Sequence, residues 1–320
     1  MRLENGTTLA AHLFSGPAAE TELGCAVLLK GTWEIRDGRL EPAAKSPWPI
    51  HLEPLKTPWG TFPGEVASRK PRTDLIVLGK AKAPRGEAVR QMTVSVSVGT
   101  FRHALAVFGD RVWERAAGGL GPSEPRPFRE MPITWESAFG GRAATPVFEM
   151  ANTDNPAGKG FVLEETDAEG VPLPNVEDPS ALISSPRDLP RPVGWGPYPL
   201  EGGVRLSRMM DGRGRPLPPD VAEPWQMAWA HPDLVLPETP APGTRIEVQG
   251  LAADAPIVAT VPALPARVTL VHGSEEVINS PRLDTLVVEA EERRLVARWR
   301  AATTFPMRPR EVRLVRVEAA

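Results

Sequence analysis

The stretch QMTVSVSVGTFRHALAVFGDRVW, residues 91–113, decides the fold class of this chain. Before Gly99, valines at every second position alternate with Thr and Ser; after Gly99, alternate positions are again apolar, interrupted by His103. Such a period of two on both sides of a glycine is typical of a half-buried β-hairpin. On the apolar face of this hairpin, His103 is expected to be a hydrogen-bonded core histidine. The stretch therefore predicts antiparallel β-structure.

Similar runs of apolar and β-branched residues recur toward both ends of the chain. They span residues 25–35, 73–81, 244–251, 255–261, 266–273 and 311–317. A second hairpin is predicted over 284–301, with its turn at Glu291-Glu292-Arg293. The spacing predicts a mostly β fold of antiparallel, sandwich-like sheets with little helix.

The middle of the chain, residues 114–240, lacks this periodicity. The chain holds 37 prolines and 28 glycines among 320 residues, about a fifth of the total, where about 12% is usual. Large apolar residues recur through the middle, so we expect it to be ordered but irregular, with one short helix over 224–230. The expected organisation is a single unit, 1–320, with an N-terminal β part (25–113), this middle (114–240) and a C-terminal β part (241–320).

Charge and composition disfavour several classes of partner. The net charge is −3 and no basic block occurs, so no nucleic-acid partner is expected. No apolar run reaches the roughly 18 residues of a membrane helix, so no membrane insertion is expected. The single cysteine, Cys25, cannot form an internal disulfide, and the first residues lack a secretory apolar core. These features predict a cytoplasmic location.

The stretch DNPAGKGF, residues 154–161, resembles a phosphate-binding loop at first sight. A Walker loop requires Ser or Thr after its lysine, but Gly160 follows Lys159. The preferred interpretation is a scaffold loop in which Asn155 opens a turn and Gly158 and Gly160 reverse the chain. Contact of Lys159 with a partner is the alternative. Ser137, in SAFGGR, lacks the glycine two residues earlier that a nucleophile elbow requires.

No metal and no cofactor are expected, because the five histidines do not fall at zinc-ligand spacings. Carboxylates leave one enzymatic alternative open. A carbohydrate-active β-sandwich enzyme requires two carboxyl groups roughly 5–9.5 Å apart across a cleft. Four candidates lie at strand ends or in Pro/Gly-rich segments: Asp74, Asp110, Glu136 and Glu177. The competing interpretation is that these carboxylates are structural.

An ordered series of blocks runs through most of the chain. The blocks are RKPRTDLIVLGKAKAP (69–84), VFGDRVW (107–113), PFREMPITWESAFGG (127–141), NPAGKGF (155–161), LPNVEDP (173–179) and LDTLVVEAEERRLVARWRA (283–301). In this order they resemble the bacterial type VI secretion adaptor family catalogued as domain of unknown function twenty-one sixty-nine. The resemblance implies a chaperone-like adaptor that loads an effector, or its PAAR domain, onto the VgrG spike. It implies no catalytic residues.

The resemblance maps onto positions that we expect to be mainly architectural. They are Lys70, Pro71, Thr73, Asp74, Gly109, Asp110, Arg111, Trp113, Pro132, Glu136, Phe139, Gly140, Gly141, Asn155, Pro156, Gly158, Gly160, Pro174, Asn175 and Glu177. Asp74, Arg111 and Glu136 are expected to form one buried ion network, since buried charges must be paired. The chain departs from the family pattern at Arg72, where a tyrosine or another aromatic residue is expected, and at Trp135, where a tyrosine is expected, and it is shorter near 200–225.

The sequence thus predicts a binding protein rather than an enzyme. Its partners are expected to be a protein effector, a PAAR-domain protein or the VgrG spike. Exposed Trp and Met are typical of such surfaces. The candidate contact residues are Met131, Trp195, Trp225, Met227 and Trp229. The carbohydrate-active enzyme is the alternative function, and a structural component of the secretion machine is the third.

Overall fold

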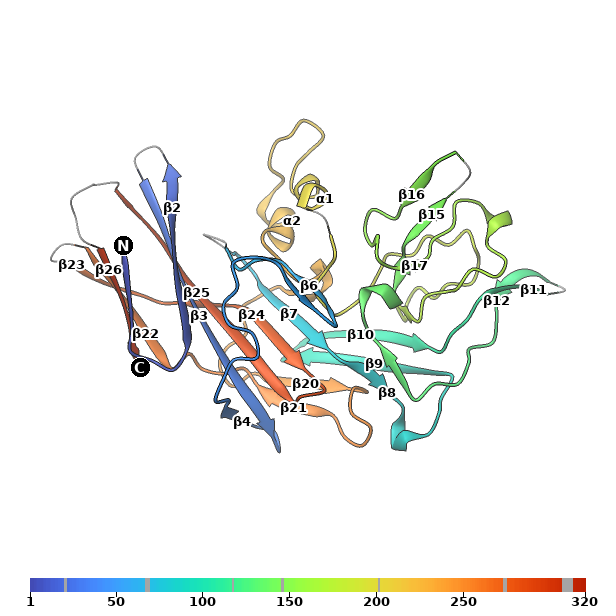
Figure 1. Ribbon diagram of the computed structural model, residues 1–320, viewed down its shortest axis with the longest axis horizontal. Coiled ribbons are helices and arrows are strands. Elements are labelled where there is room, and N and C mark those ends of the chain that lie inside the picture. The colour runs from blue at the N-terminus through green and yellow to red at the C-terminus, as the bar shows by residue number, and fades with distance from the viewer. Residues whose placement is uncertain are drawn as a thin grey trace.

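The computed structural model describes residues 1–19, 22–66, 70–116, 118–144, 147–200, 202–272, 275–306 and 313–320. It shows a mostly β protein with long central strands and two short α-helices (Figure 1). This confirms the predicted fold class, including the small share of helix. Among the described residues, no helix has both the length and the apolar character needed to cross a bilayer.

The largest sheet has the strand order β19-β7-β24-β25-β3-β2, with β4 paired to β3. Its strands are β2 (Ala10–Ala19), β3 (Glu22–Arg36), β4 (Arg39–Pro42), β7 (Thr73–Leu78), β19 (Val235–Leu236), β24 (Arg282–Glu289) and β25 (Arg294–Pro306). Pairing is antiparallel except between β7 and β24. Strands from both ends of the sequence therefore share one sheet.

The predicted hairpins are present. β9 (Gln91–Val98) and β10 (Phe101–Phe108) pair around the Gly99 turn, and β24 and β25 pair around residues 290–293. The first hairpin belongs to a five-stranded sheet ordered β18-β10-β9-β20-β21. Its other strands are β18 (Val176–Glu177), β20 (Arg245–Gln249) and β21 (Ile257–Thr260).

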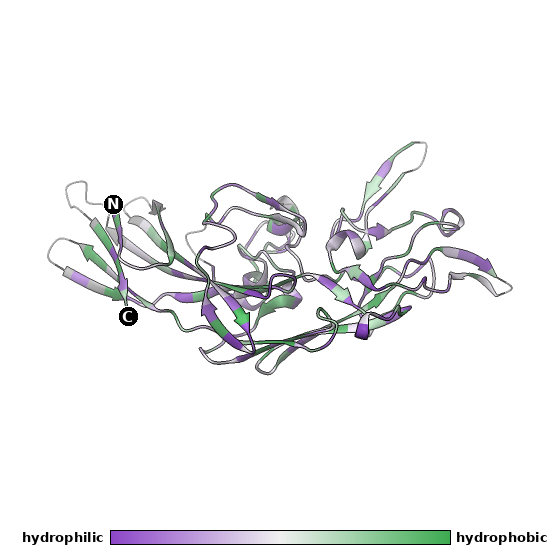
Figure 2. Ribbon diagram, turned by 60° about the horizontal axis from the view of Figure 1, so that its bottom comes forward, coloured by the Kyte–Doolittle hydropathy of each residue, from purple (hydrophilic) through white to green (hydrophobic). Residues whose placement is uncertain are grey.

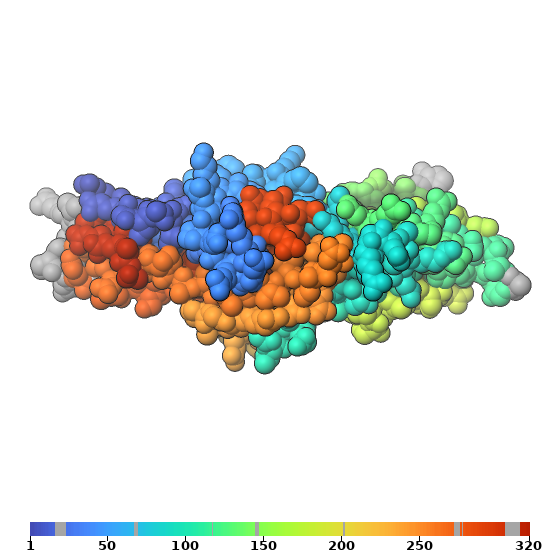
Figure 3. Space-filling model, turned by 90° about the horizontal axis from the view of Figure 1, so that it is seen from below, coloured from blue at the N-terminus to red at the C-terminus, as the bar shows by residue number. Residues whose placement is uncertain are grey.

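A four-stranded sheet, ordered β1-β26-β22-β23, brings the two termini together at one end of the elongated molecule (Figures 1 and 3). Its strands are β1 (Arg2–Asn5), β22 (Ala266–His272), β23 (Glu275–Asn279) and β26 (Arg313–Ala319). Residues 1–19, where no strand was predicted, thus supply β1 and β2. At the opposite end lies the earlier part of the middle segment, coloured green, whereas its later, yellow to orange part lies near the centre (Figures 1 and 3).

The Pro/Gly-rich middle is ordered by short two-stranded pairings rather than by long elements. The paired short strands are β11 (Trp113–Ala116), β12 (Gly119–Pro122), β13 (Glu130–Pro132), β14 (Phe139–Gly140), β15 (Arg142–Ala144), β16 (Glu149–Ala151) and β17 (Lys159–Gly160). Three further short strands lie earlier in the chain: β5 (Leu55–Thr57) pairs with β6 (Gly60–Phe62), and β8 (Lys80–Lys82) pairs with β13. The helices are α1 (Gly202–Ser207) and α2 (Pro219–Ala222), and single 3-10 turns cover Pro84–Gly86, Trp135–Ser137, Glu165–Asp167, Glu223–Trp225 and Pro232–Leu234.

The helix predicted over 224–230 is wrong in position. Only Glu223–Trp225 forms a 3-10 turn there, after α2. Met227 takes a left-handed conformation, with φ of 53°. The backbone N–H of Trp229 donates to the Asp74 carboxylate instead of to a helical carbonyl. A tertiary contact therefore replaces the helical hydrogen bond that the local pattern favoured.

One large core joins the two main sheets, and apolar residues run along the central strands (Figure 2). Two smaller clusters organise the middle segment: one forms around Trp113 and Phe139, and one around Trp135 and Tyr198. Each small cluster places aromatic side chains under irregular backbone, which explains how a Pro/Gly-rich segment remains ordered.

Candidate binding pocket over a buried charge network

A row of polar side chains crosses four adjacent strands of the largest sheet. In register, Lys30 of β3 lies opposite Arg298 of β25, Arg298 opposite Thr285 of β24, and Thr285 opposite Asp74 of β7. All four are buried. Since directly opposed residues on one face of a sheet are neighbours, the strand order itself assembles this charged row in the interior.

A register shift in β24 brings one more carboxylate into the row. The irregularity falls between Leu283 and Thr285, at Asp284. A bulge re-aims a side chain, and here Asp284 and Thr285 both meet Arg298. The Arg298 Nε donates to Asp284 Oδ1 at 2.6 Å, and its Nη2 donates to Thr285 Oγ1 at 2.7 Å. Asp284 Oδ2 also accepts from the Nε of Arg300 at 2.8 Å.

Two side chains outside the strands complete the network. Glu65 Oε1 lies 2.9 Å from Lys30 Nζ and 3.1 Å from Arg298 Nη1, while its Oε2 accepts from the His51 N–H at 2.9 Å. Lys70 Nζ pairs with Asp74 and donates to Thr285 Oγ1 at 2.9 Å. We call the following set the charge network: Lys30, Glu65, Lys70, Asp74, Asp284, Arg298 and Arg300. Four cations meet three carboxylates, so the network carries a net charge of +1.

Burial and pairing act against each other on these groups. Burial alone would raise the pKa of the Asp284 carboxyl, but Arg298, Lys70 and Arg300 hold it well below its usual range. Glu65 behaves in the same way: Arg298 and Lys30 outweigh burial and lower its pKa. Burial lowers the pKa of Lys70 to about 8, despite the opposing attraction of Asp74. Glu65 and Asp284 therefore stay ionised, whereas the charge of Lys70 is costly to keep buried.

Trp229 covers this network. Its ring lies over the Arg298 guanidinium, with the Cζ atom 4.0 Å from the ring centroid, and Lys70 Nζ lies 5.7 Å from the same centroid. Phe62 packs edge-on against the indole and His51 stacks on it. The indole thus lies between part of the buried charge network and the space above it.

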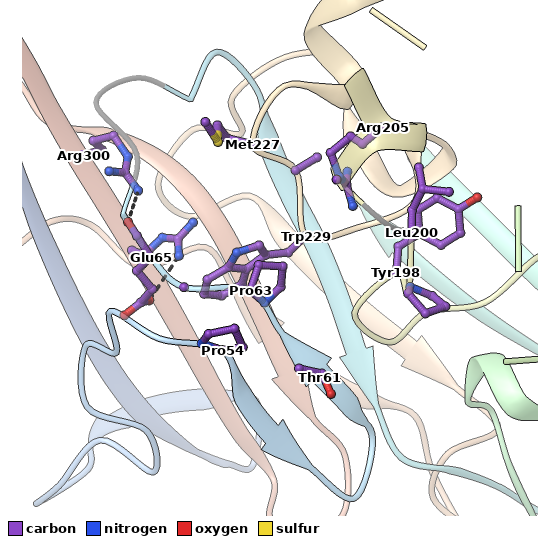
Figure 4. A pocket seen from close by; sticks show the side chains of 15 residues that line it. Pro54, Thr61, Pro63, Glu65, Tyr198, Leu200, Arg205, Met227, Trp229 and Arg300 are labelled. Atoms are coloured by element: carbon purple, nitrogen blue, oxygen red, sulfur yellow. Dashed lines mark hydrogen bonds and ion pairs between the residues drawn. The ribbon is translucent and has the colours of Figure 1, made fainter. Parts of the chain in front are cut away.

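That space is a pocket of about 540 Å³, shown in Figure 4. Its floor and sides include Trp229, Arg298, Arg300 and Glu65, and its upper wall is formed by Arg205 of α1 and by Met227. Prolines and aliphatic residues fill much of the lining: Pro54, Pro63, Pro199, Leu200 and Ala228. A mostly apolar cavity of this size with a few placed polar groups is typical of a binding site.

The model of a family described as an uncharacterized protein conserved in bacteria (DUF2169) matches residues 20–300. The chain belongs to this family. No curated protein and no solved structure matches it. The family part of the sequence resemblance is confirmed, and the family description names no activity.

Of the five candidate contact residues in this DUF2169 chain, Met227 and Trp229 line the pocket. Trp195 is fully buried, and its Nε1 donates to His103 Nδ1 at 3.0 Å, which gives His103 the expected hydrogen bond. Met131 packs against the large core and Trp225 against the cluster of Tyr198. The structure therefore brings two of the five to one cavity and places the other three elsewhere.

The expected single ion network of Asp74, Arg111 and Glu136 is wrong. Asp74 pairs with Lys70, and Glu136 is exposed. Arg111 forms a separate buried pair with Glu177, whose other oxygen accepts from the Ile183 N–H at 2.8 Å. The two ion pairs lie in different sheets, because Asp74 is in β7 and Glu177 in β18.

The DNPAGKGF loop forms part of the scaffold. Its strand β17 pairs in parallel with β14, and Asn155 Nδ2 donates to the carbonyls of Trp135 and Phe139 at 2.8 and 2.9 Å. A Cβ at Gly158 would lie 2.6 Å from the Ala138 carbonyl oxygen. Side-chain-free backbone is therefore required for close approach here, as expected for an architectural loop. Lys159 donates to Asn175 Oδ1.

Lys159 also lines a second cavity of about 600 Å³, beside Asp110, Arg111, Glu114 and Arg126. Asp110 is exposed there and accepts from Asn175 Nδ2 at 3.1 Å. Of the four carboxylates considered for a glycosidase, Asp74 and Glu177 each hold a buried cation. No specific observation favours the carbohydrate-active alternative, which stays a prediction.

Sequence reasoning missed most of the charge network. Lys30, Glu65, Asp284, Arg298 and Arg300 were not singled out. A signal was present, because Arg298 and Arg300 are two residues apart in a strand that is apolar around them and so point to the same face. Two arginines on a buried strand face require buried carboxylates, and these come from residues 65 and 284.

Proposed function

We propose that this chain is a non-enzymatic adaptor that binds a type VI secretion effector, or its PAAR-bearing part, and helps load it onto the VgrG spike. The family resemblance of the ordered sequence blocks supplies the biological context. The pocket over the charge network supplies a surface on which such binding can act.

The observation that carries the proposal is the placement of Met227 at the pocket. The residue is 53% exposed, and its backbone φ is 53°. A non-glycine residue in the left-handed region costs about 1–2 kcal/mol, and such strain concentrates at ligand-binding positions. A flexible thioether exposed at the side of an apolar cavity is typical of protein-binding surfaces.

The floor of the pocket favours binding without rearrangement. Trp229 is fixed between Arg298, Phe62 and His51, and Arg298 is held by three hydrogen-bonding partners. A surface that is ordered before binding loses little conformational entropy when the partner arrives. The charge network therefore serves the proposed adaptor as a rigid base for the contact residues.

Affinity capture from the native cytoplasm tests the proposal. The tagged wild-type protein, Met227→Asp and Val221→Asp are compared, and captured proteins are identified by mass spectrometry. Val221, in α2, is 45% exposed and outside the pocket lining, which makes it a matched control. Asp tolerates the left-handed conformation of position 227, so this variant retains the local backbone.

We expect the wild type and Val221→Asp to enrich a spike protein or a PAAR-bearing toxin, and Met227→Asp to lose it. Capture of no such protein by the wild type would contradict the adaptor role. Equal capture by all three proteins would contradict the pocket as the contact surface.

A further inference from the structure

We infer that the pocket recognises a carboxylate side chain next to an apolar residue in an exposed segment of the partner protein, with Arg205 as the anchoring cation. The inference rests on the proposed function in one respect, namely that the occupant is a protein.

The charges around the pocket are unbalanced. Its lining contains three arginines, Arg205, Arg298 and Arg300, and one carboxylate, Glu65. Glu65 is already paired with Lys30 and Arg298. Arg300 is held by Asp284. An occupant therefore meets an excess of positive charge, and electrostatic complementarity favours an anion.

Arg205 is the arginine in this lining that can donate a further hydrogen bond to an occupant. Among the residues that the structure describes, its Nη1 is buried without a hydrogen-bond partner. Burial lowers its pKa, although Asp74 and Tyr198 act in the opposite direction. Figure 4 shows its side chain extending from α1 toward the pocket, above Tyr198 and Trp229. Arg205 is half-buried, but leaving its buried Nη1 without an acceptor is costly, and a carboxylate would supply that acceptor.

The rest of the lining determines which residue type is favoured next to that carboxylate in the bound segment. Pro54, Pro63 and Pro199 have no N–H to donate, and with Leu200 and the Trp229 indole they form apolar walls. Such walls favour an aliphatic or aromatic side chain beside the anion. Inorganic phosphate fits poorly, because it requires several donors at once, whereas one guanidinium is available. The chemistry is that of an acidic–apolar peptide segment.

Fluorescence anisotropy with defined peptides tests the inference independently of any named partner. The probes are two pools of fluorescein-labelled, C-amidated six-residue peptides with randomised flanks, one with Leu-Glu fixed at the centre and one with Leu-Gln. A third pool has central Leu-Gln and a free C-terminal carboxylate. Each is titrated with wild-type protein, Arg205→Gln, Arg205→Lys and Arg208→Gln. Arg208, just after α1, pairs with Asp154 outside the pocket lining and is the matched control.

We expect the wild type to bind the Leu-Glu pool roughly tenfold or more tightly than the amidated Leu-Gln pool, the effect of a charge-assisted hydrogen bond. Arg205→Gln should abolish this preference, Arg205→Lys should restore part of it, and Arg208→Gln should keep it. High salt should weaken the preference. Equal binding of the two amidated pools, or an unchanged preference in Arg205→Gln, would overturn the inference. Stronger binding of the free-carboxylate pool would overturn it in favour of a chain terminus.

The two proposals fail separately. A Leu-Glu preference that depends on Arg205, together with no spike or effector in the affinity capture, would leave the pocket chemistry standing and remove the adaptor role. Capture of an effector, together with equal binding of the Leu-Glu and amidated Leu-Gln pools, would support the adaptor role and contradict the pocket chemistry.

Discussion

Trp229 stacks on Arg298, with the guanidinium carbon 4.0 Å from the indole centroid, and the same indole lines the pocket. The residue thus belongs to the core on one side and to the candidate binding surface on the other. Substitutions here change stability and binding together, so the two effects require separate measurements.

Trp229→Ala should destabilise the fold by about 3–5 kcal/mol, because it removes a buried aromatic side chain and the cover of a buried cation. Trp225→Ala, at a half-buried tryptophan outside the pocket lining, should cost less. Urea unfolding of both variants measures the difference. Equal losses would mean that Trp229 contributes little beyond ordinary packing. A large loss would also show why Met227, and not Trp229, is the position for binding tests.

Lys70→Met should cost about 3–5 kcal/mol, because it leaves the buried Asp74 carboxylate without its cation. The double variant Lys70→Met with Asp74→Asn should recover part of that loss. An amide remains able to accept from the Trp229 N–H, which donates to Asp74 at 2.6 Å in the wild type. A double-mutant cycle on unfolding free energies checks this. Additive losses would contradict direct coupling of the pair.

The stability of the wild type relative to Lys70→Met should rise with pH above 8. The folded pKa of Lys70 is about 8, below the ordinary value of 10.5. Between pH 8 and pH 10.5 the Lys70 amine is protonated in the unfolded chain and mostly neutral in the folded chain. The free energy of unfolding therefore rises with pH over this range, because the folded chain no longer holds a buried charge. We expect a relative gain of about 1 kcal/mol between pH 8 and pH 9.

Urea unfolding of both proteins at pH 7, 8 and 9 measures this gain. Burial raises the pKa of Cys25 to about 11, which lowers stability above pH 9 in both proteins and cancels in the difference. A difference that stays constant from pH 7 to pH 9 would show that Lys70 keeps its proton throughout this range.

Gly158→Ala should destabilise the fold by about 1–3 kcal/mol, since the new Cβ would lie 2.6 Å from the Ala138 carbonyl oxygen and overlap backbone atoms. Gly118→Ala is the control, because a Cβ there meets no heavy atom within 4 Å. Thermal unfolding compares the two. If Gly158→Ala melts like the wild type, the interpretation of DNPAGKGF as a tightly packed scaffold loop is incorrect.

Local patterns allowed much of the fold to be predicted and little of the candidate site. The period of two around Gly99 predicted β9 and β10 correctly, because strand alternation is a property of neighbouring residues. The helix expected at 224–230 failed because the Trp229 N–H bonds to Asp74, 155 residues away. Met227 and Trp229 were identified from residue type alone, whereas Arg205 has no local signature.

By itself, the sequence determined that this chain forms mostly antiparallel strands with an ordered, helix-poor middle. Alternation, turn residues and proline content act over a few residues and are visible without a structure. Only the tertiary structure decided that β3 pairs with β25 and β24 with β7, which aligns Lys30, Arg298, Thr285 and Asp74 in one buried row. Strand order depends on contacts between distant segments, so the charge network and the pocket above it arise only when those segments pack together.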